Sequence, residues 1–444
     1  MNMLYRYVVG VFLICVCCCS TPCVGQDTIL LDPEEQTGAT VRYFGWDTKG
    51  MADLSDDLQS AKWLYQDTQA NIMRIPIRPQ ASKPDGSVVF EGEIESGGYG
   101  ALIKSIKMAK QVQPRVKIFA STKLLGEDTF PTWLETDRRG KIFEHVVKQP
   151  NVEKLAGLIA EYFKHLAAEG IKIDFLGLNN EFGGALTPDD CVELAERVQT
   201  NLSESDLPDQ FKQFQWIAGE EFGVDDSVEY IQKMLEVQGA KKFIDIAGSH
   251  FYPDYKSGAI EDWQALASFD VPTWHTEVHV RRREQPAENV VALRDGMCIV
   301  FKTNQIGCEG YIWWQGSADR ELLGNLVRQK MMQSLLHGSC VKTSGQYKAR
   351  DNDPKHRVAQ ATRVKDTIWL WYFNPSDPIE QLPVKLESGE IQSASATCFR
   401  GGKNVTPESV SELEVNIDRR NQVAAYGVPK DSIVVFEIQL KSDP

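Results

Sequence analysis

Eight short apolar, β-rich segments alternate with amphipathic helical stretches between about residue 41 and residue 337. This alternation predicts repeated βα units, in which parallel strands form an inner layer that helices cover. Eight such units are the number that closes a (β/α)8 barrel. The predicted strands are 41–46, 72–77, 116–121, 175–180, 214–218, 244–250, 273–278 and 310–314.

The segments between these strands have the apolar periodicity of surface helices. Thr187 and Pro188 place a capping residue and a first-turn proline before one of them. An open, doubly wound sheet is the structural alternative, but no glycine-rich phosphate loop follows the first strand, which weakens it. The predicted helices are 53–67, 100–111, 152–169, 189–202, 228–237 and 286–303.

The pattern changes after residue 340 to strand-like segments separated by turn signals such as Asn374-Pro375-Ser376-Asp377. This pattern predicts a small antiparallel β-sandwich over 340–444. The β-rich stretch 28–31, within the leading segment 26–40, could add a strand to it. Because no low-complexity linker separates the two parts, we expect the barrel over 41–337 and the side domain to pack rigidly.

The first 25 residues resemble an export signal, with Arg6 at the start, an apolar run over 8–19 and a small-residue cleavage site at 23–25. The run is too short for a transmembrane helix. It predicts a secreted or periplasmic protein, and the five cysteines of this segment make a lipid-anchored surface form an alternative. The net charge of -14 argues against nucleic acid as a partner, because phosphate backbones are bound by basic surfaces.

Two predicted strands end in a glutamate. The fourth runs into Asn179-Asn180-Glu181, and the seventh ends at Glu277. The carboxyl ends of barrel strands carry the catalytic groups of this fold, so both glutamates are expected at the mouth. Their separation of 96 residues equals three βα units of about 32 residues each, which supports the strand count.

Two carboxylates facing each other across a barrel mouth match the needs of glycosidic-bond hydrolysis. Glu181 would donate a proton to the leaving oxygen, and Glu277 would attack the sugar carbon. A spacing of about 5–5.5 Å would retain the anomeric configuration through a covalent glycosyl-enzyme. We expect Glu277 to be ionised and Glu181 protonated near neutrality. The scheme requires no metal ion and no organic cofactor.

These residues resemble the signatures of clan A retaining glycoside hydrolases, and the C-terminal domain is similar to the side domain of glycoside hydrolase family 30. The sequence departs at Phe182, where many relatives carry proline. By the resemblance, Asn180 binds the sugar 2-hydroxyl, Arg74 and Tyr252 orient the nucleophile, and a tryptophan forms a platform under the sugar. The matching residues are Arg74, Asn180-Glu181, His250-Phe251-Tyr252, Glu277 and Trp313-Trp314.

Two other functions remain open. His275, Glu277 and His279 share one face of a regular strand and are plausible zinc or iron ligands, which would make the protein a metal-dependent hydrolase. A spacing of nearly 7 Å between successive residues on that face opposes their convergence on one ion. A carbohydrate-binding protein without catalysis would keep the aromatics and need neither glutamate. Glu220 and Glu221, after the fifth strand, are rival carboxylates.

The substrate is expected to be a polysaccharide or oligosaccharide bound by a monomer. Arg281, the first residue of Arg281-Arg282-Arg283, could recognise a uronate or sulfate, which favours an acidic glycan such as glucuronoxylan or a sulfated galactan. A solvated basic loop is the alternative for these arginines. Gly183 and Gly184 are expected to let the chain turn sharply and a sugar approach closely.

Overall fold

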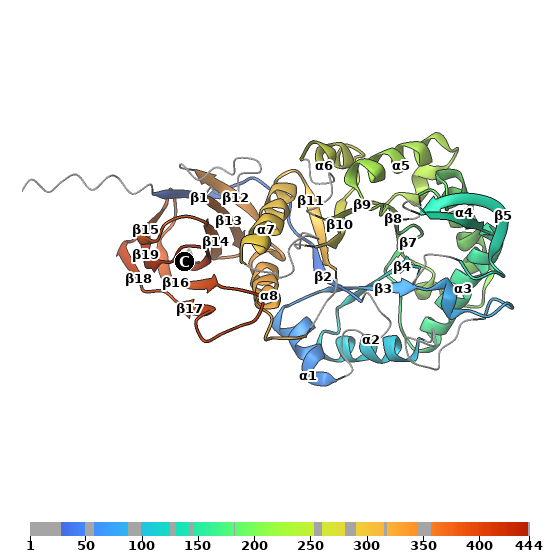
Figure 1. Cartoon of the computed structure of the whole chain (residues 1–444), viewed down its shortest axis with the longest axis horizontal. Coiled ribbons are helices and arrows are strands. Elements are labelled where there is room, and N and C mark those ends of the chain that lie inside the picture. Colours follow the sequence, from blue (N-terminus) through green and yellow to red (C-terminus); the bar gives the residue numbers. More distant parts are fainter. Residues whose placement is uncertain are drawn as a thin grey trace, which may run out of the picture.

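The computed structural model describes residues 28–48, 57–87, 99–124, 130–142, 145–181, 183–252, 260–279, 290–314, 318–344 and 357–442. Two parts lie side by side along the longest axis, a barrel and a folded β-sheet, with the helices α7 and α8 between them (Figure 1). The predicted signal segment over 1–25 lies outside the described residues.

Eight parallel strands close the barrel in the order β10-β11-β2-β3-β4-β7-β8-β9, which confirms the predicted (β/α)8 barrel. Its interior is a packed apolar layer, to which each strand contributes one side chain: Tyr43, Ile72, Phe119, Phe175, Ile217, Ile246, Trp274 and Ile312. The polar groups of the barrel mouth lie directly above this apolar layer, at the carboxyl ends of the strands. The strands are β2 (Tyr43–Asp47), β3 (Ile72–Ile77), β4 (Lys117–Thr122), β7 (Phe175–Gly177), β8 (Gln215–Gly219), β9 (Ile246–Phe251), β10 (Thr273–Val278) and β11 (Cys308–Trp313).

The helices surround the barrel, and side chains cap the N-termini of three of them. The Thr187 side chain accepts a hydrogen bond from the Asp190 amide at the start of α4, as predicted, and Asn151 caps α3 and Asp57 caps α1 in the same way. Within the described ranges, no helix has the length and apolar character needed to cross a membrane. The α-helices are α1 (Leu58–Ala61), α2 (Gly100–Val112), α3 (Val152–Ala168), α4 (Pro188–Glu204), α5 (Val224–Glu236), α6 (Ile260–Ala267), α7 (Val290–Gln305) and α8 (Leu323–Leu335).

Short helical turns complete the covering layer. The π-helical turn η1 (Lys62–Asp67) continues α1, and the 3-10 turns are η2 (Pro79–Ala81), η4 (Asp209–Phe211) and η5 (Ala240–Phe243). The helices α6 and α8 have no counterpart among the predicted ones. In α8 the buried face includes the polar residues Asn325, Arg328 and Ser334, so the contrast between an apolar and a polar stripe that marks a surface helix is weak.

The side domain is one ten-stranded sheet in the order β17-β16-β20-β14-β13-β12-β1-β15-β19-β18. Neighbouring strands are antiparallel except β1 and β15, which are parallel. The sheet folds over so that β16 contacts β18 and β19, and it encloses an apolar core as the predicted sandwich does. Its strands are β1 (Ile29–Gln36), β12 (Ser339–Ser344), β13 (Val358–Val364), β14 (Thr367–Asn374), β15 (Ile379–Leu386), β16 (Ile391–Arg400), β17 (Val410–Glu412), β18 (Val415–Arg419), β19 (Gln422–Val428) and β20 (Ser432–Leu440).

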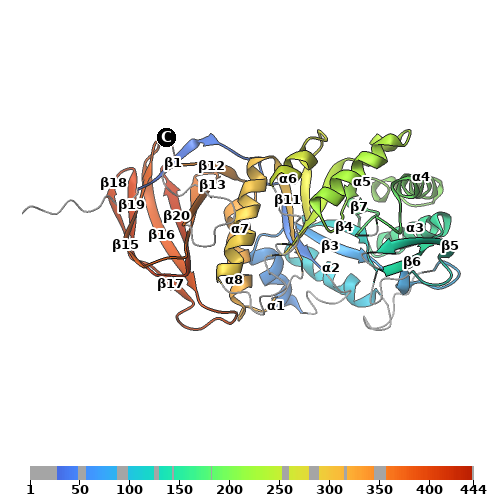
Figure 2. The ribbon, with the colours of Figure 1, turned by 45° about the horizontal axis from the view of Figure 1, so that its top comes forward.

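The hydrophobic layer between the barrel and its helices extends onto one face of the side sheet. Both views place α7 and α8 between them (Figure 2). The core cluster of the barrel continues through these helices to Trp371, Phe373 and Val435 on the facing side of the sheet. The Trp371 indole donates a hydrogen bond of 3.0 Å to the Ser334 hydroxyl of α8. The helices are therefore buried on two sides, and the two parts form one packed unit.

A two-stranded hairpin that the sequence pattern did not predict lies between β4 and α3. It consists of β5 (Glu135–Ile142) and β6 (His145–Pro150). The Lys141 amide donates to the Gly184 carbonyl at 3.0 Å, and a Cβ on Gly184 would stand 2.2 Å from the Lys141 carbonyl oxygen. A Cβ on Gly183 would stand 2.4 Å from a Glu221 carboxylate oxygen. These glycines make room for protein atoms, and the close approach of a sugar to them stays a prediction.

Candidate active site

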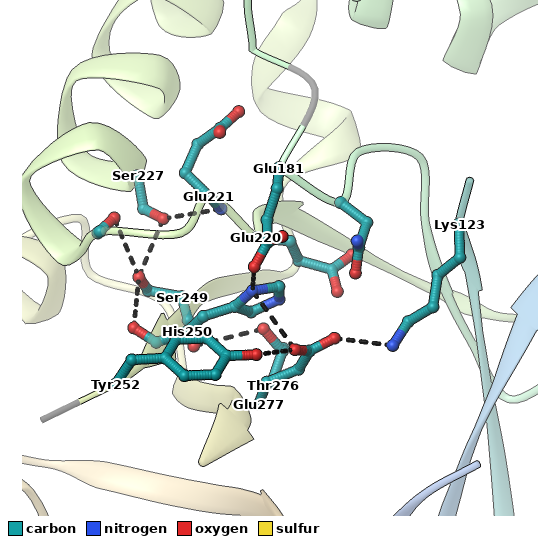
Figure 3. Close-up of polar contacts among 12 residues, drawn as sticks. Lys123, Glu181, Glu220, Glu221, Ser227, Ser249, His250, Tyr252, Thr276 and Glu277 are labelled. Atoms are coloured by element: carbon teal, nitrogen blue, oxygen red, sulfur yellow. Dashed lines mark hydrogen bonds and ion pairs between the residues drawn. The ribbon is translucent and has the colours of Figure 1, made fainter. Parts of the chain in front are cut away.

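The strands β7 and β8 end in two glutamates with left-handed backbone. Glu181 has φ 65° and Glu220 has φ 57°, values that non-glycine residues rarely adopt. The Glu181 amide donates to the Glu220 carbonyl at 3.0 Å, which ties the two strand ends together. Strained residues of this kind cluster at functional sites, where the surrounding structure holds them. Here the strain turns the Glu181 side chain over the barrel mouth (Figure 3).

Glu181, His250 and Glu277 form a compact cluster at the mouth. His250 Nδ1 lies 2.5 Å from Glu181 Oε1 and 3.7 Å from Glu277 Oε2. One side-chain atom from each of the three residues lies within 4.8 Å of those of the other two. The structure thus brings the two sequence-predicted carboxylates together at close to the separation expected for a retaining glycosidase.

A β-bulge in β10 turns Glu277 into the mouth. His275 pairs with Ser249 of β9, but Glu277 pairs with His250, so Thr276 is an extra residue in the ladder. His275 therefore faces the helices, where it stacks on Trp263 with ring centroids 3.6 Å apart. The expectation that His275 and Glu277 share one face was wrong, because the bulge interrupts the two-residue alternation of the strand.

Glu277 is surrounded by hydrogen-bond donors. Its Oε1 accepts from Arg74 Nη1 and, at 2.7 Å, from Lys123 Nζ. Its Oε2 accepts from the Tyr252 hydroxyl, and Lys123 and Tyr252 approach from opposite sides (Figure 3). Burial alone would raise the pKa of Glu277, but the positive charges of His250, Lys123 and Arg74 hold that pKa well below its usual range. The carboxylate is therefore ionised and firmly oriented.

His250 is fully buried between the two carboxylates. Burial acts to lower the pKa of this imidazole, but the charges of Glu277 and Glu181 outweigh it and raise the pKa. Protonated His250 then carries its charge between the two glutamates. Glu181 keeps 16% of its side chain exposed against 4% for Glu277, so the more accessible carboxylate stands on the solvent side of the pair.

Arg74 of β3 contacts residues on or just after five other barrel strands beneath the cluster. It is fully buried, and its guanidinium donates to Asp47 at 2.6 Å, to Glu220 at 2.7 Å and to the Asn180 amide oxygen at 2.6 Å. Burial acts to lower the pKa of Arg74, but Glu220, Glu277 and Asp47 raise it further above its ordinary value. Arg74 therefore fixes Asn180 next to Glu181 and compensates the negative charges of the buried Asp47 and Glu220.

Sequence reasoning missed three residues of this network: Asp47 at the end of β2, Ser121 on β4 and Lys123 just after it. Lys123 Nζ lies 2.7 Å from both Asp47 and Glu277, and the Ser121 hydroxyl accepts from Arg74 at 3.1 Å. The available signal was their position, since each is a polar residue at the carboxyl end of a predicted strand. Their mutual contacts depend on closure of the barrel, which the sequence pattern does not specify.

Aromatic rings line one side of the mouth. The Tyr252 ring stacks on Phe222 with centroids 4.8 Å apart, and Trp314 meets Tyr252 and His279 edge to face at 5.9 and 5.2 Å. Trp314 is half-buried at this position. It is the tryptophan that the structure places beside the cluster.

Trp313 lies on the other face of β11. It is fully buried, packs against Phe44 and lies beneath the Arg328 guanidinium of α8. The prediction that Trp313 binds substrate was therefore wrong, because successive residues of a strand point to opposite faces. Arg281, another predicted binding residue, lies outside the described residues.

Glu221 lies buried beside the turn at Gly183, and among the described residues no cationic side chain forms a hydrogen bond with its carboxylate. Its Oε1 accepts from Asn179 Nδ2 at 2.5 Å, directly under Gly183. Burial raises the pKa of Glu221 to about 7, the Asn179 hydrogen bond opposes this shift, and the charge of Glu181 adds to it. Glu221 thus exchanges its proton near neutrality.

Replacing Glu221 with glutamine is expected to stabilise the protein above neutral pH. The folded protein holds this proton up to about pH 7, whereas the ordinary pKa of the side chain is 4.5, so wild-type stability is full below pH 4.5 and falls as pH rises through 7. The glutamine of Glu221→Gln cannot ionise. At pH 8 the free energy of unfolding of this variant should therefore exceed that of wild type by on the order of 3 kcal/mol, at about 1.4 kcal/mol per pKa unit. Urea unfolding at pH 4.5 and pH 8 measures this gain.

The exposed Glu229, replaced in the same way, serves as the matched control and should change neither midpoint. Equal stabilities of Glu221→Gln and wild type at pH 8 would show that Glu221 ionises freely in the folded protein.

The Glu181, His250 and Glu277 cluster also has the ligand types of a metal site. Two observations oppose a metal ion there: Arg74 and Lys123 both contact Glu277, and a divalent cation would lie beside these two positive charges. The alternative ligand set does not converge either, since His275 faces the helices and donates to or accepts from Thr303 at 3.0 Å.

A scan of protein-family models finds no match to this sequence, and a search of curated proteins finds none. Solved structures do match. A glycoside hydrolase family 30 subfamily 8 xylanase from Clostridium acetobutylicum superposes with a TM-score of 0.63 at 16% identity, over 93% of this chain and 99% of that one. A family 30 endoxylanase from Clostridium papyrosolvens gives 0.66 at 13% identity, over 93% and 100%.

An endo-β-1,6-glucanase superposes with a TM-score of 0.59 at 16% identity, over 94% of each chain. These matches span the barrel and the side sheet together, so the chain has the two-part fold of these glycoside hydrolases.

Proposed function

We propose that this protein is a retaining β-glycoside hydrolase, with Glu181 as acid/base and Glu277 as nucleophile. The observation that carries the proposal is the pair of carboxylates with oxygens within 4.8 Å at the barrel mouth, where the charges of His250, Lys123 and Arg74 keep Glu277 ionised. The fold supports it, because structures titled as xylanases and a glucanase share both parts of the chain's architecture.

In the first step, a Glu277 oxygen forms a bond to the anomeric carbon as the glycosidic carbon–oxygen bond breaks. Glu181 transfers its proton to the departing oxygen, so the aglycone leaves as a neutral alcohol. In the second step, Glu181 takes a proton from water, the water oxygen bonds to the anomeric carbon, and the electron pair of the ester bond returns to Glu277. Two inversions leave the configuration unchanged.

The neighbouring groups have distinct parts in this scheme. Asn180, which Arg74 holds beside Glu181, hydrogen-bonds the sugar 2-hydroxyl in this proposal. Tyr252 orients Glu277 through its hydroxyl. His250 lies between the carboxylates and moderates their repulsion when Glu181 has given up its proton.

The proposed substrate is a β-linked polysaccharide or oligosaccharide, and an acidic glycan such as glucuronoxylan or a sulfated galactan is the more specific proposal. It rests on Arg281 and the two arginines after it, whose planar side chains suit carboxylate and sulfate groups. The apolar run over 8–19 supports export, which would place the enzyme where such polymers occur.

A panel of neutral, uronate-bearing and sulfated polysaccharides tests the function, with products identified by mass and the anomeric configuration followed by NMR during the first turnovers. We expect cleavage with retention, unchanged by a chelator. Inverted products would overturn the assignment of Glu277 as nucleophile. An activity that appears elsewhere and is abolished by the chelator would overturn the proposal.

Replacing Trp314 with alanine is expected to weaken substrate use without unfolding the protein. A sugar that covers about 80 Å² of the ring would gain on the order of 2 kcal/mol, at about 25 cal/mol per Å². The expected loss in kcat/KM is therefore roughly 30-fold. Steady-state kinetics on the best substrate of the panel measures it, and Trp314→Phe should recover most of the loss. Unchanged kinetics in Trp314→Ala would place the sugar elsewhere in the mouth.

A further inference from the structure

Lys123 contacts the nucleophile, although the proposed mechanism gives it no task. It follows β4 directly, and its side chain is 9% exposed. Its ammonium lies 2.7 Å from Glu277 Oε1 and 2.7 Å from Asp47 Oδ2. Figure 3 shows it reaching Glu277 from the side opposite Tyr252. A lysine whose only task was to neutralise a buried carboxylate could pair with Asp47 and would not need to contact Glu277.

The same Glu277 oxygen also binds Arg74, so two positive side chains stabilise the negative charge of this carboxylate. Arg74 has four further acceptors in Asp47, Glu220, Asn180 and Ser121 and remains compensated when Glu277 changes charge. Among the described residues, Lys123 makes polar contacts with Asp47 and Glu277. Of the two cations, Lys123 is therefore the one whose environment changes most when Glu277 becomes an ester.

Formation of the glycosyl-enzyme removes the negative charge from Glu277, because one of its oxygens bonds to the anomeric carbon as the glycosidic bond breaks. Lys123 then keeps its contact with the Asp47 carboxylate in a nearly fully buried site. Hydrolysis of the ester restores the charge, since water bonds to the anomeric carbon and the electron pair of the broken bond returns to Glu277. Lys123 stabilises the free carboxylate, so it opposes the first step and favours the second.

We propose that Lys123 is a catalytic residue that makes Glu277 a good leaving group, so that the covalent glycosyl-enzyme is hydrolysed quickly and does not accumulate. This inference rests on the proposed function, because it requires a covalent intermediate on Glu277. The proposal assigns Lys123 to the second step, hydrolysis of the glycosyl-enzyme. An ion pair with a structural role only would not affect one chemical step more than the other.

The pH dependence of kcat/KM is a second measurement of the Lys123–Glu277 contact. An opposite charge at this distance lowers the pKa of a carboxyl group by about 1–3 units, so removal of Lys123 should raise the pKa of Glu277 by a similar amount. The acid limb of the pH profile of kcat/KM should then move to higher pH. The other charged or titratable groups around Glu277 and Lys123, which stay in place, are Asp47 on β2, Arg74 on β3, Glu181 after β7, Glu220 after β8, and His250 and Tyr252 on or next to β9.

The experiment compares wild type with Lys123→Met on dinitrophenyl β-xylobioside, or on the dinitrophenyl β-glycoside of whichever sugar the polysaccharide panel identifies. We expect Lys123→Met to release about one dinitrophenol per enzyme in a rapid burst and then turn over about 10- to 100-fold more slowly than wild type, which shows no burst. The acid limb should rise by about 1–3 pH units. Lys123→Arg, which keeps the charge, should show neither change.

Asp47→Asn provides a test in the opposite direction and covers the case in which Lys123→Met does not fold. Without the Asp47 charge, Lys123 acts more strongly on Glu277, so the acid limb should move downward and no burst should appear. A folded Lys123→Met with no burst and an unmoved limb would assign Lys123 a structural role only, with the proposed function intact. Failure of wild type to cleave any glycoside would overturn both the function and this inference.

Discussion

Replacing Glu277 with glutamine is expected to reduce kcat by at least about 10⁴-fold, while the protein folds and binds glycan as wild type does. The amide has the shape of the carboxylate but cannot form the glycosyl ester, and removal of a nucleophile that acts covalently costs about this much or more in other enzymes. Steady-state kinetics on the identified polysaccharide measures kcat, and calorimetric titration with an oligosaccharide measures binding.

Glu181→Ala gives the matched comparison, because the two carboxylates act in different steps. On a dinitrophenyl glycoside the leaving group needs no proton, so the covalent intermediate should form and then wait for a general base. Azide, which needs no base, should restore turnover and give a β-glycosyl azide for Glu181→Ala but not for Glu277→Gln. A protein that keeps its activity in both variants would not use this pair, and a carbohydrate-binding module would bind glycan throughout with no turnover to lose.

Replacing Arg74 with methionine is expected to have the largest effect on stability, a loss of about 3–5 kcal/mol. The change leaves Asp47 and Glu220 buried without the guanidinium that both of them contact. It also releases Asn180 and one of the two cations on Glu277, so activity should fall together with stability. Urea unfolding at pH 7 measures the loss of stability, and the melting temperature should fall by several degrees.

The double variant Arg74→Met with Glu220→Gln separates charge from packing. It removes one of the uncompensated carboxylates and should recover part of the lost stability, since an unpaired buried charge costs more than a neutral amide. A loss below about 1 kcal/mol in Arg74→Met would show that water or a rearranged Lys123 compensates the carboxylates. Exposed ion pairs such as Arg197 with Glu193 should contribute well below that amount.

The barrel could be predicted from the sequence because its signal is local. Each strand is a short apolar run, and the structure places strands at or within a few residues of all eight predicted positions. The prediction failed where local patterns are weak. The helix α8 buries Asn325, Arg328 and Ser334 together with its apolar residues, and the strand β13 that packs on it begins more than 20 residues after the helix ends. An amphipathic stripe is hard to recognise when polar residues lie on the buried face.

The candidate site could be predicted only in part. Glu181 and Glu277 stand out because each is a carboxylate at the end of an apolar strand. The contact of Arg74 with Glu277 joins residues 203 positions apart, and the contact of Lys123 with Glu277 joins residues 154 apart. Such contacts follow from strand order and register. The bulge at Thr276 shows the same limit, since strict alternation would have turned Glu277 outward.

The place of β1 in the side sheet has a consequence for the order of folding. Leu30 pairs with Ser344 on one side and with Lys385 on the other, so a strand from the beginning of the described chain lies inside a sheet otherwise made from its end. The whole barrel is encoded between them. During synthesis, β1 must therefore remain unpaired until its partners β12 and β15 have been made. Until then both edges of β1 expose unpaired backbone N–H and C=O groups. Pairing over such sequence distances is slow, so completion of this sheet is the expected late event of folding.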